Sequence, residues 1–229
     1  MLSFNQFLIN EKLAYLNKDE KKLSLVAAAL CLECYKTARD FVFKKVNDTP
    51  FLAFRGTKSL QSWIYDLTPG ITNDVWAGFN NFAQDLQNDI KPYLSLPNLI
   101  FTGHSLGATV AAIEYVEYCR QGNHGMLFTF GSPRIGNDKF LKKLFQGQDS
   151  EQIKKNAHFI YLSQGDKVDP VSSLPPNLPD LVNQFKEYLD IINLTNQDKQ
   201  SLLKVLTGLH LHSMVNYQDS LESFLADET

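Results

Sequence analysis

Ser105 lies in the stretch FTGHSLGATVA, at residues 101–111, with Gly103 two positions before it and Gly107 two positions after it. The residues at 98–101 are typical of a buried strand, and the small and apolar residues at 106–119 favour a helix. At a sharp turn from strand to helix the flanking backbone segments come close together, so glycine is required on both sides of the exposed serine. Unpaired N–H groups at the helix start can also stabilise an oxyanion. The pattern therefore predicts that Ser105 is a nucleophile.

A serine hydroxyl needs a base to remove its proton, and the base needs an acid to orient it. In a sheet that carries such a turn, the order along the chain is serine, acid, histidine. The acids in SQGDKVDPVSSLPP are Asp166 and Asp169, and the downstream histidines are His124, His158, His210 and His212. Residue type and order alone do not choose among them. His210 and His212 could also be read as half of a metal site, but no cluster of Cys or His accompanies them, so we expect no metal.

Strands and helices alternate along most of the chain. The apolar patterns predict strands at 41–46, 50–56, 98–101, 126–132 and 158–163, and helices at 20–40, 76–94, 106–119, 138–146, 196–208 and 216–228. This alternation indicates an α/β fold with a mostly parallel central sheet covered by helices on both faces.

The whole chain sets further bounds. Its 229 residues, of which 44% are hydrophobic, can form a sizeable core, and we expect a single domain over residues 1–229. The 22 basic and 25 acidic residues give a net charge of −3 without a basic cluster, which argues against nucleic-acid binding. No segment is long and apolar enough for a transmembrane span, and no signal peptide is visible.

The cysteines Cys31, Cys34 and Cys119 are an odd number, and the first two are one helical turn apart, which is unfavourable for a structural disulfide. We expect Cys31 and Cys34 to be core residues. A reduced, cytoplasmic compartment is the default for such a chain, while export by a dedicated secretion route or a mature secreted form stays open.

Four ordered blocks, AFRGT, FTGHSLGA, FGSPRIGN and DPVSSLPP, are followed by HSMVNY. In these blocks, between about residues 51 and 217, the chain resembles the fungal-type, or class 3, triacylglycerol lipases of the α/β-hydrolase superfamily. The first fifty residues carry no block that matches. The resemblance implies the α/β-hydrolase fold with a short helical lid, and hydrolysis of lipid esters without metal or cofactor.

The resemblance also implies a catalytic triad. The elbow serine of the family corresponds to Ser105. Asp169 opens a D-x-V-x-x-[LV]-P block, whereas no Leu-Pro follows Asp166 at the right distance. The family's base is a histidine five residues before an aromatic residue, which corresponds to His212 and Tyr217.

Other site residues follow from the same blocks. The residue after the glycine of AFRGT supplies an oxyanion donor in the family, which assigns this role to Thr57, with the backbone N–H of Leu106 as the second donor. His104 is expected to pack in the elbow rather than act as a base, because its side chain points away from the nucleophile. Arg55 and Arg134 are expected to form structural ion pairs.

The segment KSLQSWIYDLTPG, at residues 58–70, has apolar residues at helical spacing. They are Leu60, Trp63, Ile64 and Leu67, which would share one face of a helix. Such a face is commonly packed permanently on a core, but in the family the corresponding segment is a lid, and we expect it to shield the nucleophile until it meets a lipid–water interface.

The predicted function is that of a serine carboxylester hydrolase acting on lipid esters through an acyl-enzyme. Phospholipases of the A type and feruloyl esterases belong to the same family, and a non-catalytic binding module of the same fold is a further alternative. Ser173 stands where family members often have a basic residue or histidine, so one wall of the pocket is not assigned. Acyl chain length, head group and oligomeric state do not follow from the sequence.

Overall fold

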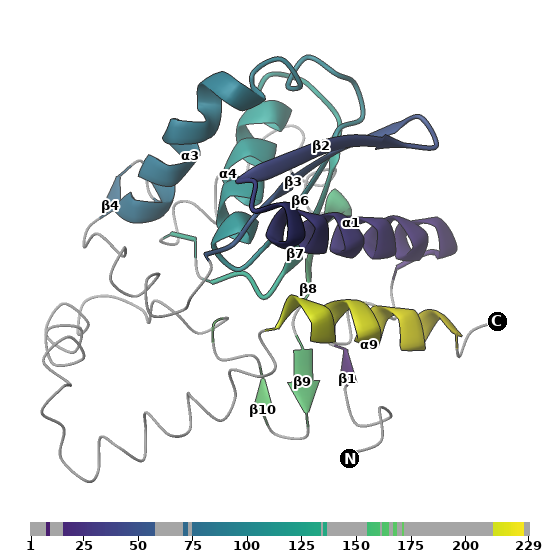
Figure 1. Ribbon diagram of the computed structural model, residues 1–229. Helices are drawn as coiled ribbons and strands as arrows, with labels where there is room; N and C mark the ends of the chain where they lie inside the picture. The colour runs from purple at the N-terminus through teal and green to yellow at the C-terminus, as the bar shows by residue number, and fades with distance from the viewer. Residues whose placement is uncertain are drawn as a thin grey trace, which may run out of the picture.

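A five-stranded sheet forms the centre of the molecule, with strand order β2-β3-β6-β7-β8 (Figure 1). The computed structural model describes residues 8–9, 16–57, 71–72, 75–133, 135–136, 155–160, 162–164, 167–168, 171 and 213–226. The strands of the central sheet are β2 (Phe41–Val46), β3 (Thr49–Phe54), β6 (Ile100–His104), β7 (Met126–Phe130) and β8 (Ala157–Ile160). Only β2 runs antiparallel to its neighbour, while β3, β6, β7 and β8 are parallel, which confirms the mostly parallel sheet.

Helices cover both faces of this sheet (Figure 1). They are α1 (Lys18–Thr37), α3 (Ala77–Ile90), α4 (Leu106–Arg120) and α9 (Met214–Ala226). Side chains of β3 alternate between the two faces, as strand geometry requires. Leu52 and Phe54 join the core beneath α3 and α4, whereas Phe51 and Ala53 join the core beneath α1 and α9. These helices correspond to the segments predicted at 20–40, 76–94, 106–119 and 216–228.

The sequence around Asn17 explains where α1 begins. The Asn17 carbonyl oxygen Oδ1 accepts a hydrogen bond from the Glu20 N–H at 3.0 Å, and the Glu20 carboxylate accepts one from the Asn17 N–H at 2.9 Å. This reciprocal pair satisfies donors that a helix start leaves free. The helix ends at Thr37 and is capped by Ala38, which has a left-handed φ of 54°. Between these ends, the fully buried Ala27 and Ala28 let the helix pack closely on the sheet.

Short strands lie outside the central sheet. β1 (Leu8–Ile9), β9 (Leu162–Gln164) and β10 (Lys167–Val168) form an antiparallel sheet, and β4 (Ile71–Thr72) pairs with β5 (Val75–Trp76). The single strand predicted at 158–163 is therefore wrong in one respect, because β8 ends at residue 160 and the chain then joins the second sheet as β9. The partner of β9 is β1, and local sequence pattern does not indicate a pairing across this separation.

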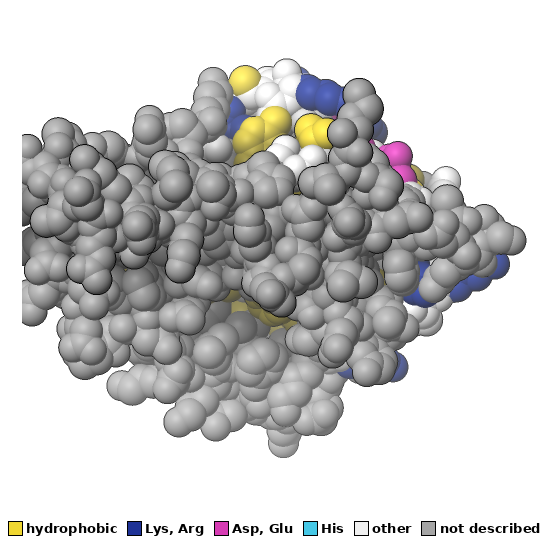
Figure 2. All heavy atoms as spheres, turned by 90° about the horizontal axis from the view of Figure 1, so that it is seen from below, with side chains coloured by type: hydrophobic (Ala, Val, Ile, Leu, Met, Phe, Trp, Pro, Cys, Tyr) yellow, Lys and Arg dark blue, Asp and Glu magenta, His cyan; other side chains and the backbone are white. Residues whose placement is uncertain are grey.

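The predicted helices at 138–146 and 196–208 and the predicted lid at 58–70 lie outside the described residues. None of the helices in the described part of the chain has the length and apolar character that crossing a membrane requires. Seen from below, the described side chains include hydrophobic groups together with basic and acidic ones (Figure 2).

Candidate active site

Ser105 occupies the junction between β6 and α4. Its φ and ψ angles are 57° and −126°, a conformation that a non-glycine residue rarely adopts and that costs about 1–3 kcal/mol. The surroundings hold this geometry in place. The Ser105 N–H donates to the Phe130 carbonyl at the end of β7 at 3.0 Å, and the Ser105 carbonyl accepts from the Ala108 N–H at 3.0 Å. The serine predicted from the motif therefore lies at a strained strand-to-helix elbow.

The two glycines of the motif lie where backbone segments touch. A Cβ atom on Gly103 would collide with the carbonyl group of Gly107, and a Cβ on Gly107 would collide with the carbonyl group of Phe54 at the end of β3. Both obstacles are backbone atoms, which cannot move aside as a flexible side chain can. Glycine at these positions is thus a steric requirement of the elbow.

The segment after β3 runs directly beside the elbow. Phe54 is the register partner of Gly103, so the residues that follow each of them leave the sheet side by side. A Cβ on Gly56 would lie 2.9 Å from Cβ of Ser105. Thr57, the next residue, is half-buried, and Leu106, directly after the serine, begins α4. The structure thus brings the segment that carries Thr57 against Ser105.

His104 is buried beneath the elbow, with 5% of its surface exposed. Its Nδ1 atom lies 2.8 Å from the hydroxyl oxygen of Tyr35, near the end of α1. The ring of Tyr217, in α9, packs edge-on against the His104 ring with centroids 5.8 Å apart. His104 therefore packs between the two helices on the α1 face of the sheet.

Tyr35 was not identified from the sequence, although it contacts two of the motif blocks. Besides lying close to His104, its hydroxyl accepts a hydrogen bond from the Gly56 N–H, and burial raises the pKa of Tyr35 well above its ordinary value. The hydroxyl therefore stays protonated and joins the segment of Thr57 to the elbow. A tyrosine in the last turn of an amphipathic helix gives no signal of this contact, because both partners are distant in sequence.

Of the predicted triad, Ser105 is the member that lies within the described residues. Asp169 and His212 lie outside them, as do Arg134 and the lid residues Leu60, Trp63, Ile64 and Leu67. Their immediate neighbours are described in part. Val171, two residues after Asp169, is fully buried, and Tyr217, five residues after His212, packs against His104.

Arg55 forms the predicted ion pair. Its guanidinium Nη2 donates to the Asp40 carboxylate at 2.6 Å, and the Arg55 N–H donates to the Asp40 carbonyl at 2.9 Å. The two contacts hold the end of β3 to Asp40, the residue that precedes β2. They also fix the start of the segment that carries Thr57.

The chain matches the family model described as lipase (class 3) over residues 51–178, a range that contains most of β3, the elbow and the segment of Asp169. The chain belongs to the class 3 lipase family. Its mostly parallel sheet with helices on both faces and an elbow at the end of β6 is the α/β-hydrolase fold that the sequence blocks predict.

The curated proteins that the chain resembles include fungal lipases. A secreted mono- and diacylglycerol lipase A from Penicillium camembertii is 29% identical over 154 residues, which cover 61% of this chain and 47% of the relative. A secreted mono- and diacylglycerol lipase 1 from Fusarium solani is 29% identical over 175 residues, covering 69% of this chain and 49% of the relative. The chain thus spans about half the length of these curated relatives.

Among solved structures, the Rhizomucor miehei lipase propeptide complex is 18% identical and covers 74% of this chain and 66% of the other, with a TM-score of 0.48.

In the described part of the chain, neither a metal-binding cluster nor a thiolate from Cys31 or Cys34 adds to the chemistry of the elbow. No cluster of three or more His, Cys, Asp or Glu side chains is placed there to hold a metal ion. Cys31 and Cys34 are free and fully buried, as expected for core residues. Burial raises the pKa of Cys34 to about 12 and that of Cys31 further, so neither thiol supplies a thiolate nucleophile at neutral pH.

Proposed function

We propose that this class 3 family member is a serine carboxylester hydrolase that acts on lipid esters. In the proposed reaction, Ser105 Oγ attacks the ester carbonyl carbon while His212 takes the hydroxyl proton and Asp169 orients the imidazole. The proton then passes to the leaving alcohol, and water hydrolyses the acyl-enzyme by the same route in reverse. No step requires a metal or a cofactor.

The conformation of Ser105 is the observation that carries this proposal. A buried serine with ordinary dihedral angles would need no explanation, but this one is held at a φ of 57° between two backbone segments that admit only glycine at their points of contact. Strain of this kind persists where the surrounding structure maintains it for function. The names of the relatives, which are lipases for mono- and diacylglycerols, support esters of glycerol as the substrate class.

The proposed oxyanion donors are Thr57 and the backbone N–H of Leu106. Leu106 is the first residue of α4, whose N–H groups and positive dipole end favour a developing negative charge. The contact of Gly56 with Ser105 supports a position for Thr57 on the other side of the same oxygen. Removal of one such donor typically reduces kcat by about 10²–10³-fold.

Access to the serine is the second part of the proposal. Ser105 is only 3% exposed, which supports a reaction in which a covering segment moves before an ester reaches the hydroxyl. We assign this movement to the segment that carries Leu60, Trp63, Ile64 and Leu67, which would turn an apolar face toward a lipid surface. The relatives from Penicillium and Fusarium are named as secreted proteins, and a secreted form of this chain would meet such surfaces.

A fluorophosphonate probe tests the proposal. We expect labelling at Ser105 in the parent protein, no labelling in Ser105→Ala, and unchanged labelling in Ser95→Ala, which removes an exposed serine. The same proteins are assayed on a panel of soluble short-chain esters, emulsified triacylglycerols and phospholipids, where Ser105→Ala should lose at least about 10³-fold in kcat. Labelling that survives in Ser105→Ala, or full turnover by this variant, would overturn the nucleophile and the mechanism.

A further inference from the structure

His104, directly before the proposed nucleophile, has an environment that packing alone does not explain. Its imidazole lies edge-on between two tyrosine rings, with centroids 5.7 Å from the Tyr35 ring and 5.8 Å from the Tyr217 ring. An apolar side chain would fill this place without the cost of burying polar atoms, yet a histidine lies there with 5% of its surface exposed. The two rings limit the orientations of the imidazole, and its Nδ1 atom lies 2.8 Å from the Tyr35 hydroxyl oxygen.

The Tyr35 hydroxyl determines which nitrogen of His104 carries the proton. Its oxygen accepts from the Gly56 N–H, and it has one proton of its own to donate. Among the described residues, Nδ1 of His104 is the acceptor that this proton can reach. A proton on Nδ1 would instead point a second donor at the tyrosine oxygen and deprive the hydroxyl proton of that acceptor. The network therefore assigns to His104 the neutral tautomer that is protonated on Nε2.

The other end of this network reaches Ser105 through Gly56. A Cβ atom on Gly56 would lie 2.6 Å from the His104 carbonyl oxygen and 2.9 Å from Cβ of Ser105, so the Gly56 backbone lies directly against the elbow. Thr57, the proposed oxyanion donor, is the next residue. A shift of Gly56 would therefore move that donor relative to Ser105. Such a shift matters because an oxyanion donor acts at about 2.7–3.1 Å from the oxygen it stabilises.

We propose that His104 is a positioning residue for the oxyanion hole. Its Nδ1 accepts the Tyr35 proton, which keeps the tyrosine oxygen directed at the Gly56 N–H and holds Thr57 at a fixed distance from Ser105. This inference rests on the proposed function, because it concerns the same oxyanion hole. His104 takes no proton from Ser105 or from the substrate, and its effect is on the transition state, so kcat changes more than KM.

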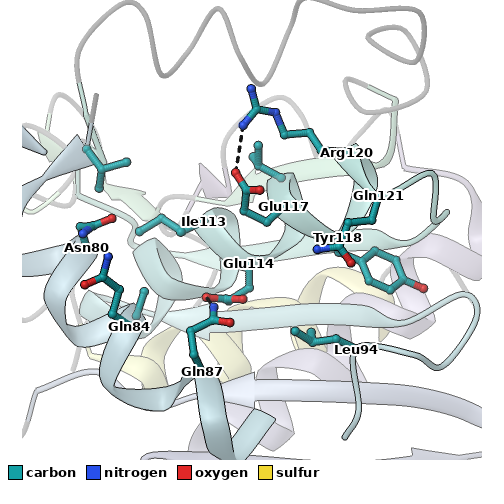
Figure 3. A pocket seen from close by; sticks show the side chains of 13 residues that line it. Asn80, Gln84, Gln87, Leu94, Ile113, Glu114, Glu117, Tyr118, Arg120 and Gln121 are labelled. Atoms are coloured by element: carbon teal, nitrogen blue, oxygen red, sulfur yellow. Dashed lines mark hydrogen bonds and ion pairs between the residues drawn. The ribbon is translucent and has the colours of Figure 1, made fainter. Parts of the chain in front are cut away.

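A hydrogen bond between α3 and α4 provides a structural control (Figure 3). The Gln87 amide on α3 donates to the Glu114 carboxyl group on α4, and both residues line a cavity of about 470 Å³. These helices pack on one face of the sheet, whereas Tyr35 and Tyr217 belong to the core on the other face. Gln87→Leu therefore removes a hydrogen bond that joins two elements and leaves the network beneath the elbow intact.

The tautomer of His104 can be measured directly. The test records the imidazole ¹⁵N shifts of the isotope-labelled full chain at neutral pH, and His104→Asn identifies the His104 signals by their loss. We expect Nε2 to carry the proton and Nδ1 to have the shift of an unprotonated acceptor. A proton on Nδ1, in the other tautomer or in the imidazolium ion, would overturn the network.

Two substitutions separate the acceptor from the packing. In His104→Asn the amide Oδ1 offers an acceptor close to the place of Nδ1, whereas His104→Leu provides a similar volume without one. We expect kcat on a soluble ester to fall about tenfold in His104→Leu, with KM little changed, and to be at least about fivefold higher in His104→Asn than in His104→Leu. Hydrogen exchange of the Gly56 amide should be faster in His104→Leu than in the parent. Gln87→Leu should lose stability but keep the parent's kcat and Gly56 exchange.

Two results would reduce His104 to a packing residue. One is a kcat in His104→Leu that equals or exceeds that of His104→Asn, after correction for the folded fraction. The other is unchanged exchange of the Gly56 amide in His104→Leu. The tautomer and the amide exchange are measured without turnover, so they can fail while fluorophosphonate still labels Ser105. Failure of the proposed function would instead appear as the absence of this labelling in the parent protein.

Discussion

At the scale of single residues, the acid and the base of the proposed triad each have a second candidate nearby. Asp166 is the alternative to Asp169, and His210 is the alternative to His212. We expect His212→Ala and Asp169→Ala each to lower kcat by orders of magnitude on a soluble ester, because the triad acts as a unit. His210→Ala and Asp166→Ala are the matched controls and should have mild effects. Steady-state kinetics on all four variants decides the question. The reverse ranking in either pair would show that the motif has been aligned two or three residues out of register.

A comparison of Gly107 with Gly122 separates two effects of adding a Cβ atom to a glycine. One is collision with neighbouring atoms, and the other is strain from a positive φ. A Cβ at this position would collide with the Phe54 carbonyl, whereas Gly122, with a φ of 82°, has no heavy atom within 4 Å of its Cβ position. Gly122→Ala should therefore cost only the strain of its positive φ, about 1 kcal/mol. Gly107→Ala should cost several-fold more, because strand or helix backbone must move. Urea unfolding measures both, and equal losses would mean that the elbow can relax.

Tyr35→Phe tests whether the hydroxyl beneath the elbow positions the reacting groups. The change removes the hydrogen bonds that the Tyr35 hydroxyl makes with Nδ1 of His104 and with the Gly56 N–H, so we expect about 1–2 kcal/mol less stability and a kcat about tenfold lower, with KM little changed. Tyr118→Phe is the control, since that hydroxyl donates to the Leu96 carbonyl at 2.7 Å and has no contact with the elbow. An equal loss of kcat in both variants, after correction for the folded fraction, would indicate a purely structural role.

At the scale of elements, the packing of α3 on α4 should depend on pH through Glu114. Burial raises the pKa of Glu114 from its ordinary 4.5 to about 7, so the native state holds a proton that the unfolded chain releases. Stability therefore falls as the pH rises from about 4.5 through 7, by about 3 kcal/mol in total, and is unaffected by this group below that window.

The Glu114→Gln variant keeps the shape of the side chain and removes this proton equilibrium. We expect it to match the parent near pH 5 and to exceed it by about 3 kcal/mol at pH 8, measured by urea unfolding at both values. Glu117→Gln, which breaks a half-exposed pair with Arg120, is the control and should change stability by less than about 1 kcal/mol at either pH. Parallel pH profiles of parent and Glu114→Gln would contradict the assignment.

At the scale of the whole molecule, the local sequence pattern predicted the layers of sheet and helices. It did not predict the features that depend on contacts between residues far apart in the chain. The segments at 41–46, 126–132 and 106–119 are rich in apolar residues, and they correspond to β2, β7 and α4. The elbow was predictable because its close backbone contacts require glycines, and Gly103 and Gly107 lie two residues on either side of Ser105. The contact between Tyr35 and His104 was not, because it joins positions 69 residues apart. The assignments of Asp169 and His212 remain predictions that rest on the motif blocks.

Access to Ser105 also belongs to this scale, since it involves the protein and a lipid surface together. The serine is 3% exposed, and the segment with Trp63 follows the proposed oxyanion residue Thr57 in the chain. If this segment is a lid, removal of its largest apolar side chain reduces the area that contacts lipid and leaves the triad intact. Trp63→Ala should then lower turnover of an emulsified medium-chain ester much more than turnover of a short soluble ester.

The decisive measurement is the rate of the parent protein across the solubility limit of the medium-chain ester. A lid predicts a sharp rise once droplets form, because only a lipid surface compensates for exposing the apolar face of the segment. Ser95→Ala is a control whose exposed position should leave both rates unchanged. A smooth saturation curve, with equal losses on both substrates in Trp63→Ala, would instead identify the segment as a fixed wall of the pocket, and substrate would then have to reach the buried serine by another route.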